Sequence, residues 1–92
     1  MPTYLVERYL PGRDRAWLEA ALARLRRQRT KAAYLGSTYV PEDDSCFCRF
    51  EAETADDVRD ANELARVPLA RIVAAQEIGI RQPEPPEKGD GS

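Results

Sequence analysis

Residues 45–52 read SCFCRFEA, and side chains of two kinds alternate strictly along them. In a β-strand, successive side chains point to opposite faces of the sheet. One face of this segment is small and apolar, and the other mixes an aromatic ring with charges: Cys46, Cys48 and Phe50 against Phe47, Arg49 and Glu51. The segment therefore predicts a strand whose first face packs on a core. Its second face is either exposed to solvent or lines a functional site.

Three other segments have the composition of strands. Residues 3–9 (TYLVERY) and 33–40 (AYLGSTYV) are rich in β-branched and aromatic residues, and residues 71–80 (RIVAAQEIGI) form a further apolar stretch. Residues 41–44 (PEDD) are typical of a turn. Because this connection is short, it predicts an antiparallel hairpin between 33–40 and 45–52.

Two helices are expected between these strands. Asp14 and Thr54 are suitable N-cap residues, each followed by a helical pattern. The apolar residues recur at helical spacing: Leu18, Ala21, Leu22 and Leu25 in the first helix, and Val58, Ala61 and Ala65 in the second. Pro68 ends the second helix. Each helix therefore has one apolar stripe to bury.

The resulting order is βαββαβ, which predicts an α+β, ferredoxin-like fold. We expect a four-stranded antiparallel sheet in the order 4-1-3-2, with both helices on one face. The domain is expected to span residues 1–80. Residues 81–92 are rich in proline and glycine and have no large apolar side chain, so they predict a disordered tail.

Pairing Val40 with Ser45 at the turn assigns the two faces of the predicted sheet. The face toward the helices is expected to be mainly apolar, with Val6, Leu35, Ser37, Tyr39, Cys46, Cys48 and Phe50. The open face is expected to be mixed, with Leu5, Glu7, Tyr9, Tyr34, Gly36, Thr38, Phe47, Arg49, Glu51, Val73, Ala75 and Glu77. The apolar side chains of this open face are too many to leave exposed to water, and its charged side chains are too many to bury in an ordinary apolar core. A homodimer with a polar cleft between two sheets satisfies both conditions.

Composition excludes several classes of protein. The formal net charge is −2 and the pI is about 5.2, so nothing indicates a nucleic-acid partner. The arginines at the end of the first helix complement the helix dipole without a partner. The sequence contains no apolar run of the roughly 20 residues that span a membrane. Residues 1–4 lead directly into a strand, so we expect no signal peptide and a cytoplasmic location.

The cysteine pattern indicates packing more than metal chemistry. Cys46 and Cys48 lie two residues apart on one strand face, where a disulfide would strain the extended backbone. A zinc site usually takes four Cys or His ligands, and the chain has no histidine. We interpret both as buried thiols, with a redox or soft-metal role as the alternative.

Four blocks of sequence resemble a family of small actinobacterial domains of unknown function whose members are called nickel-binding proteins. They are residues 4–12 (YLVERYLPG), 34–44 (YLGSTYVPEDD), 46–52 (CFCRFEA) and 65–72 (ARVPLARI). The resemblance covers residues 3 to about 78. It implies a ferredoxin-like dimer of the dimeric α/β-barrel type and a possible nickel cofactor. It assigns no metal ligand in this chain, so the metal-binding residues stay unknown.

The charged cluster of the open face is the candidate site. We expect the cleft to bind a ligand through Glu7, Tyr9, Tyr34, Thr38, Phe47, Arg49, Glu51 and Glu77. One hypothesis is a binding protein for nickel, another divalent metal or a small molecule. The alternative is an acid–base enzyme of the isomerase or cyclase type, in which Glu7 is the base and Arg49 or Tyr9 the electrophilic group. A third possibility is that these charges only pair across strands at the dimer interface.

Overall fold

The computed structural model describes residues 1–79, so the predicted tail and residue 80 lie outside the described part of the chain. The elements follow the expected order and are β1 (Thr3–Tyr9), α1 (Arg15–Arg27), β2 (Ala33–Val40), a short 3-10 turn η1 (Pro41–Asp43), β3 (Ser45–Glu51), α2 (Ala55–Ala65) and β4 (Arg71–Ala75). The strands form one antiparallel sheet in the order β2-β3-β1-β4. The predicted α+β, ferredoxin-like fold and its strand order are therefore confirmed.

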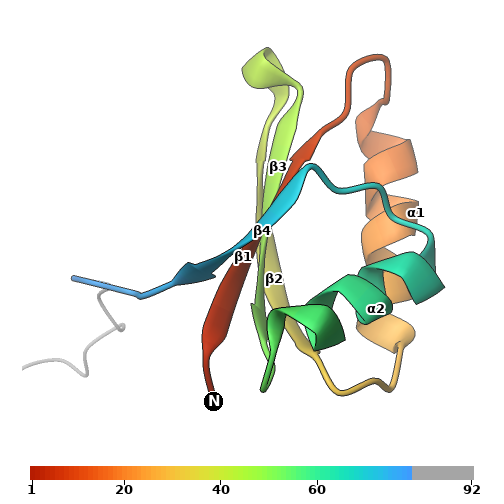
Figure 1. Cartoon of the computed structure of the whole chain (residues 1–92). Helices are drawn as coiled ribbons and strands as arrows, with labels where there is room; N and C mark the ends of the chain where they lie inside the picture. Colours follow the sequence, from red (N-terminus) through yellow and green to blue (C-terminus); the bar gives the residue numbers. More distant parts are fainter. Residues whose placement is uncertain (80–92) are drawn as a thin grey trace, which may run out of the picture.

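Both helices lie on the same side of the sheet, and the opposite side is uncovered by any element of residues 1–79 (Figure 1). The helices begin as predicted. The Asp14 carboxylate accepts from the Trp17 backbone N–H at 2.8 Å, and the Thr54 hydroxyl accepts from that of Asp57 at 3.2 Å. Each bond satisfies one of the donors that a helix N-terminus leaves unpaired.

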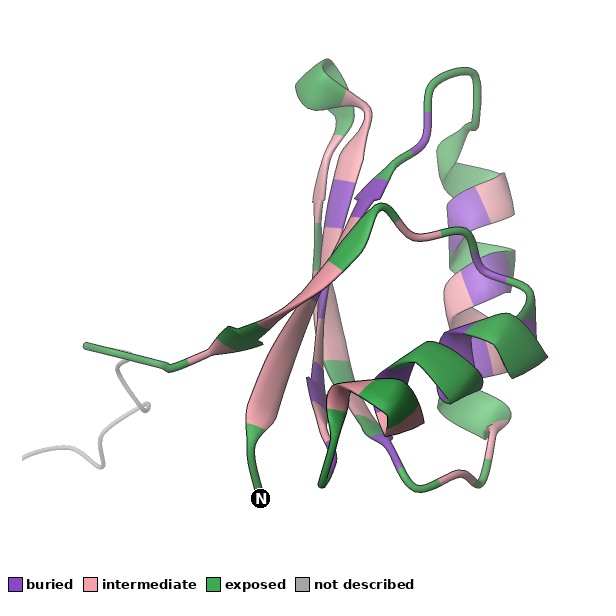
Figure 2. Ribbon diagram, in the orientation of Figure 1, coloured by how far each residue is buried: buried purple, intermediate pink, exposed green. Residues whose placement is uncertain are grey.

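The core fills the space between the helices and the sheet (Figure 2). The predicted helical stripes supply one wall, chiefly Leu18, Ala21, Leu25, Val58, Ala61 and Ala65. The alternate positions of the central strands supply the other, chiefly Val6, Cys46, Cys48 and Phe50. The strict alternation of β3 is thus realised as one fully buried face and one partly exposed face.

A β-bulge in β2 corrects the predicted faces. Tyr34 pairs with Phe50 and Gly36 with Arg49, so one extra residue of β2 lies between these pairs. Tyr34 therefore packs against the core, with its ring centroid 5.5 Å from that of Phe50. Leu35, expected to face the helices, is 46% exposed. Gly36 has φ +143°, a conformation that side chains disfavour and that lets the strand accommodate the extra residue.

Strand β4 is shorter than the predicted strand 71–80, because β1, the strand with which it pairs, begins at Thr3. Ala75 pairs with Thr3, and Thr3 is the first residue of β1. Beyond Ala75, no backbone groups of β1 remain to continue the ladder.

We expect Tyr34→Ala to lower the free energy of unfolding by about 2–4 kcal/mol, because it removes a ring packed on the core. Leu35→Ala should cost less than about 1 kcal/mol, because Leu35 is largely exposed. Urea denaturation of both variants at one protein concentration measures the difference. A larger cost for Leu35→Ala would show that β2 pairs without the bulge.

Candidate functional site

The open face of the sheet carries a patch of partly exposed apolar side chains. Leu5 lies opposite both Arg49 and Val73, and Glu7 lies opposite both Phe47 and Arg71. These residues share the face that points away from the helices, since Val6 between them is buried on the helix side. Leu5, Phe47 and Val73 are all only partly buried. This arrangement agrees with the mixed face expected from the sequence.

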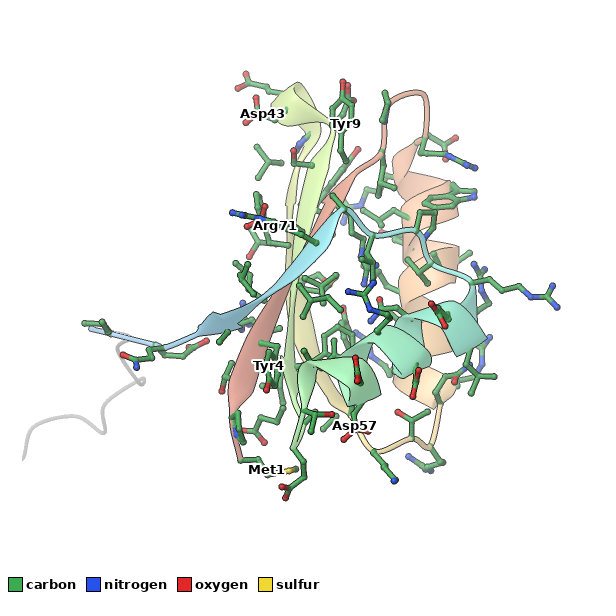
Figure 3. The ribbon with its side chains drawn as sticks, viewed as in Figure 1. Met1, Tyr4, Tyr9, Asp43, Asp57 and Arg71 are labelled. Atoms are coloured by element: carbon green, nitrogen blue, oxygen red, sulfur yellow. The ribbon has the colours of Figure 1, made fainter. Side chains whose placement is uncertain are left out.

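Glu7 of β1 forms an ion pair with Arg71 of β4. Nε and Nη2 of Arg71 donate to Oε1 and Oε2 of Glu7 at 3.0 and 3.1 Å. The pair raises the pKa of the exposed Arg71 guanidinium, chiefly through these hydrogen bonds. Figure 3 shows Arg71 at the start of β4, with its side chain on the side away from the helices. Sequence reasoning missed Arg71, although it shares strand parity with Val73 and Ala75.

A second charged pair lies over the bulge. Nε of Arg49 is 3.7 Å from Oε2 of Glu77, which follows the end of β4. A Cβ on Gly36 would lie 3.4 Å from Nη2 of Arg49, so the guanidinium covers this glycine closely. Arg49 therefore pairs with Glu77, beyond the end of β4. Glu7 pairs with Arg71 instead of Arg49.

Most of the predicted ligand-binding residues share the open face. Strand parity and pairing place Glu7, Tyr9, Thr38, Phe47, Arg49 and Glu51 there, with Glu77 beside them. Tyr34 is the exception, because the bulge turns it toward the core. Tyr9 is 65% exposed at the end of β1. The other site residues thus lie on one surface, and their role in binding stays a prediction.

One chain does not provide a metal centre among its described residues. The 92 residues include no histidine, and residues 1–79 contain no group of three Cys, Asp or Glu side chains placed to hold an ion. Nickel favours imidazole nitrogen at ordinary protein sites. Residues 1–79 of a single chain therefore do not fit nickel.

The helix side of the sheet contains a buried cation that sequence reasoning missed. Arg8 is 2% exposed, and its guanidinium makes three contacts. Nε donates to Sγ of Cys48 at 3.4 Å, Nη2 to Oδ1 of Asn62 at 2.6 Å, and Nη1 to the Pro68 carbonyl oxygen at 3.0 Å. Strand alternation alone puts Arg8 on the same face as Val6, which is the signal that could have found it.

Cys48 is the centre of a polar network under the helices. Its Sγ lies 2.9 Å from the Ser37 hydroxyl and 3.9 Å from Sγ of Cys46, and the Tyr34 hydroxyl hydrogen-bonds Ser37. The hydrogen bond with Cys46, helped by Arg8 and Ser37, lowers the pKa of Cys48 to about 6. The same bond and burial raise the pKa of Cys46. Both cysteines are free and buried, as predicted.

A groove runs between α1 and the edge strand β2, next to this network. Its volume is about 600 Å³. The lining is largely apolar, with an ion pair and one serine: Leu18, Leu22, Tyr39, Pro41, Arg15, Glu19 and Ser37. Ser37 thus contacts both the groove and the thiol of Cys48. The groove is a second candidate site on the helix side of the sheet.

Comparison with known proteins identifies the family. A family model described as nickel responsive protein SCO4226-like matches residues 4–74. The chain belongs to this family. No curated protein matches the chain. Among residues 1–79, no helix has the length and apolar character needed to cross a membrane.

One solved structure is similar over most of the chain. It is the crystal structure of SCO4226 from Streptomyces coelicolor A3(2), with a TM-score of 0.60 and 16% sequence identity. The match covers 87% of this chain and 99% of that one. At this identity the match supports the fold alone, and it confirms the predicted ferredoxin-like fold.

We expect Cys48 to make the stability of the protein depend on pH. Its pKa is about 6 in the folded chain and about 8.5 in an unfolded one, so the unfolded state binds more protons between these values. The free energy of unfolding should therefore decrease as the pH falls from about 8.5 through 6. Denaturation of wild type and Cys48→Ser across this range measures the effect. Parallel pH curves for the two proteins would contradict it.

Proposed function

We propose that this chain is a small dimeric binding protein whose ligand lies in a polar cleft between the open faces of two sheets. The observation that carries the proposal is the asymmetry of the sheet. Two helices cover one face, and the other has partly exposed apolar side chains beside two ion pairs. Such a surface is unusual for a monomer of this size.

A second copy of the chain is the partner that fits this face. Two-fold symmetry would place like surfaces together, so the apolar row of Leu5, Phe47 and Val73 could be covered by its own equivalent. Glu7 and Arg49 lie between these apolar side chains on the central strands, so their ion pairs with Arg71 and Glu77 would lie inside the covered area as its polar part.

The family supports a divalent metal ion, nickel above all, as the ligand. Since the described residues of one chain do not fit nickel, the proposed donors are open-face carboxylates from both chains of a dimer, chiefly Glu51, because Glu7 and Glu77 pair with Arg71 and Arg49. The buried thiols are poor candidates. Nε of Arg8 lies 3.4 Å from Sγ of Cys48, and its positive charge would repel a metal ion there.

No contact favours the alternative of an acid–base enzyme. Both carboxylate oxygens of Glu7, the proposed base, accept hydrogen bonds from Arg71. Tyr9, one proposed electrophilic group, is 65% exposed. The binding function therefore remains the proposal.

We expect wild type to be a dimer at micromolar concentration and Phe47→Asp to raise its dissociation constant at least tenfold, because the change puts a charge into the apolar row. Leu64→Asp is the matched control. It introduces the same charge at a 65% exposed position of α2, away from the open face. Sedimentation equilibrium measures both variants, with circular dichroism as the test of folding. A monomeric wild type, or equal effects of the two variants, would contradict the proposed interface.

We expect the wild-type dimer to bind nickel stoichiometrically in titration calorimetry, with zinc and magnesium as comparison ions. Binding should persist in the Cys46→Ser/Cys48→Ser double variant, because the thiols are not the proposed ligands. It should be lost in Phe47→Asp, which separates the two sheets. Absence of heat with wild type, or equal binding by the monomeric variant, would argue against a metal site between the sheets.

A further inference from the structure

Arg8 is a buried cation, and its one partner within the described chain that can carry a negative charge is a cysteine. Within residues 1–79, no ion pair joins Arg8 to a carboxylate. Its other acceptors, the Asn62 amide and the Pro68 carbonyl, are neutral. An unpaired buried charge is strongly unfavourable. The arrangement is therefore balanced when Cys48 is a thiolate.

The groups around Sγ of Cys48 can all donate to it. They are Nε of Arg8, the hydroxyl of Ser37 and the thiol of Cys46, and the Tyr34 hydroxyl can in turn donate to Ser37. Charged or titratable groups approach the thiol from both neighbouring strands, Arg8 from β1 and Tyr34 from β2, and Cys46 approaches it from the same strand. From the helix side, Arg26 of α1 lies over the Tyr34 ring, with 5.8 Å between its guanidinium carbon and the ring centroid, while the residues that α1 and α2 bury are uncharged.

The pKa values agree with this geometry. The network lowers the pKa of Cys48 to about 6, so at neutral pH it is largely ionised. The hydrogen bond to Cys48 and burial raise the pKa of Cys46, which remains a thiol. Because a thiolate is the nucleophilic form of cysteine, reactivity should be confined to Cys48.

Access to the sulfur is narrow. Cys48 has no exposed surface, but Ser37, which contacts its Sγ, lines the groove between α1 and β2. Leu18 and Leu22 line the same groove from α1. A reagent must displace the Ser37 side chain to reach the sulfur, so only a small, uncharged molecule fits the route.

We propose that Cys48 is a modification site for small hydroperoxides, with hydrogen peroxide as the simplest, entering from the α1–β2 groove past Ser37. The thiolate sulfur attacks one peroxide oxygen, so that an S–O bond forms and the O–O bond breaks. The sulfur is oxidised and the peroxide is reduced, each by two electrons. The second oxygen leaves as hydroxide, which a buffer acid protonates to water, and Cys48 becomes a sulfenic acid.

Oxidation also alters the fold around the site. A protonated sulfenic acid is neutral, so Arg8 loses its counter-charge. Arg8 holds Asn62 of α2 and the carbonyl of Pro68 after it. The contact between α2 and the sheet should therefore weaken when Cys48 is oxidised.

The test follows hydrogen peroxide oxidation of the full chain by mass spectrometry, with dimedone to trap sulfenic acid. In wild type, where Cys46 still donates to Cys48, we expect an adduct on the Cys48 peptide at pH 7.5 and a rate about tenfold lower at pH 5, below the pKa of about 6. Cys48→Ser is the matched control, and its Cys46 should stay unmodified. Peptide mapping assigns the adduct in wild type to Cys48 or to Cys46.

Two results would overturn the proposal. One is a Cys48 that forms no adduct at pH 7.5, and the other is a Cys46 that reacts equally fast. The route is tested by Leu22→Trp, which fills the groove and should slow oxidation several-fold. An unchanged rate in a folded Leu22→Trp protein would overturn entry through the groove.

Discussion

Two helices can cover only one face of a four-stranded sheet, and the other features of this protein follow from that constraint. The covered face must be apolar enough to form a core, and the uncovered face must suit water or a partner. Strand β3 meets both demands by strict alternation, with Cys46, Cys48 and Phe50 inside and Phe47, Arg49 and Glu51 outside. The two candidate sites lie on opposite sides of this one strand.

The arginines on the open face of the sheet and the arginine on its covered face have different partners. On the open face, Arg71 and Arg49 pair with carboxylates where water still reaches them, so each pair contributes little to stability. On the covered face, Arg8 is buried with no carboxylate partner among residues 1–79, and its Nε donates to the sulfur of Cys48. The buried arginine therefore affects both the stability of the core and the chemistry of Cys48, whereas the exposed arginines do neither to a comparable extent.

Sequence periodicity was a reliable guide where the chain alternates without interruption. It correctly predicted β1, β3, both helix caps and the strand order, because each depends on local patterns and on a small set of allowed connections. It failed at β2, where a bulge exchanges the faces of Tyr34 and Leu35. A bulge depends on how the paired strand twists and packs, which a single segment does not encode.

The sequence by itself determined the ferredoxin-like fold, the bare face of the sheet and most of its charged residues, since period and spacing specify which side chains share a face. Only the tertiary structure decided which charges meet. Glu7 pairs with Arg71 from a strand 64 residues away, and Arg8 meets Cys48 across 40 residues. Such pairings depend on strand register and side-chain packing in three dimensions, and no local pattern contains them.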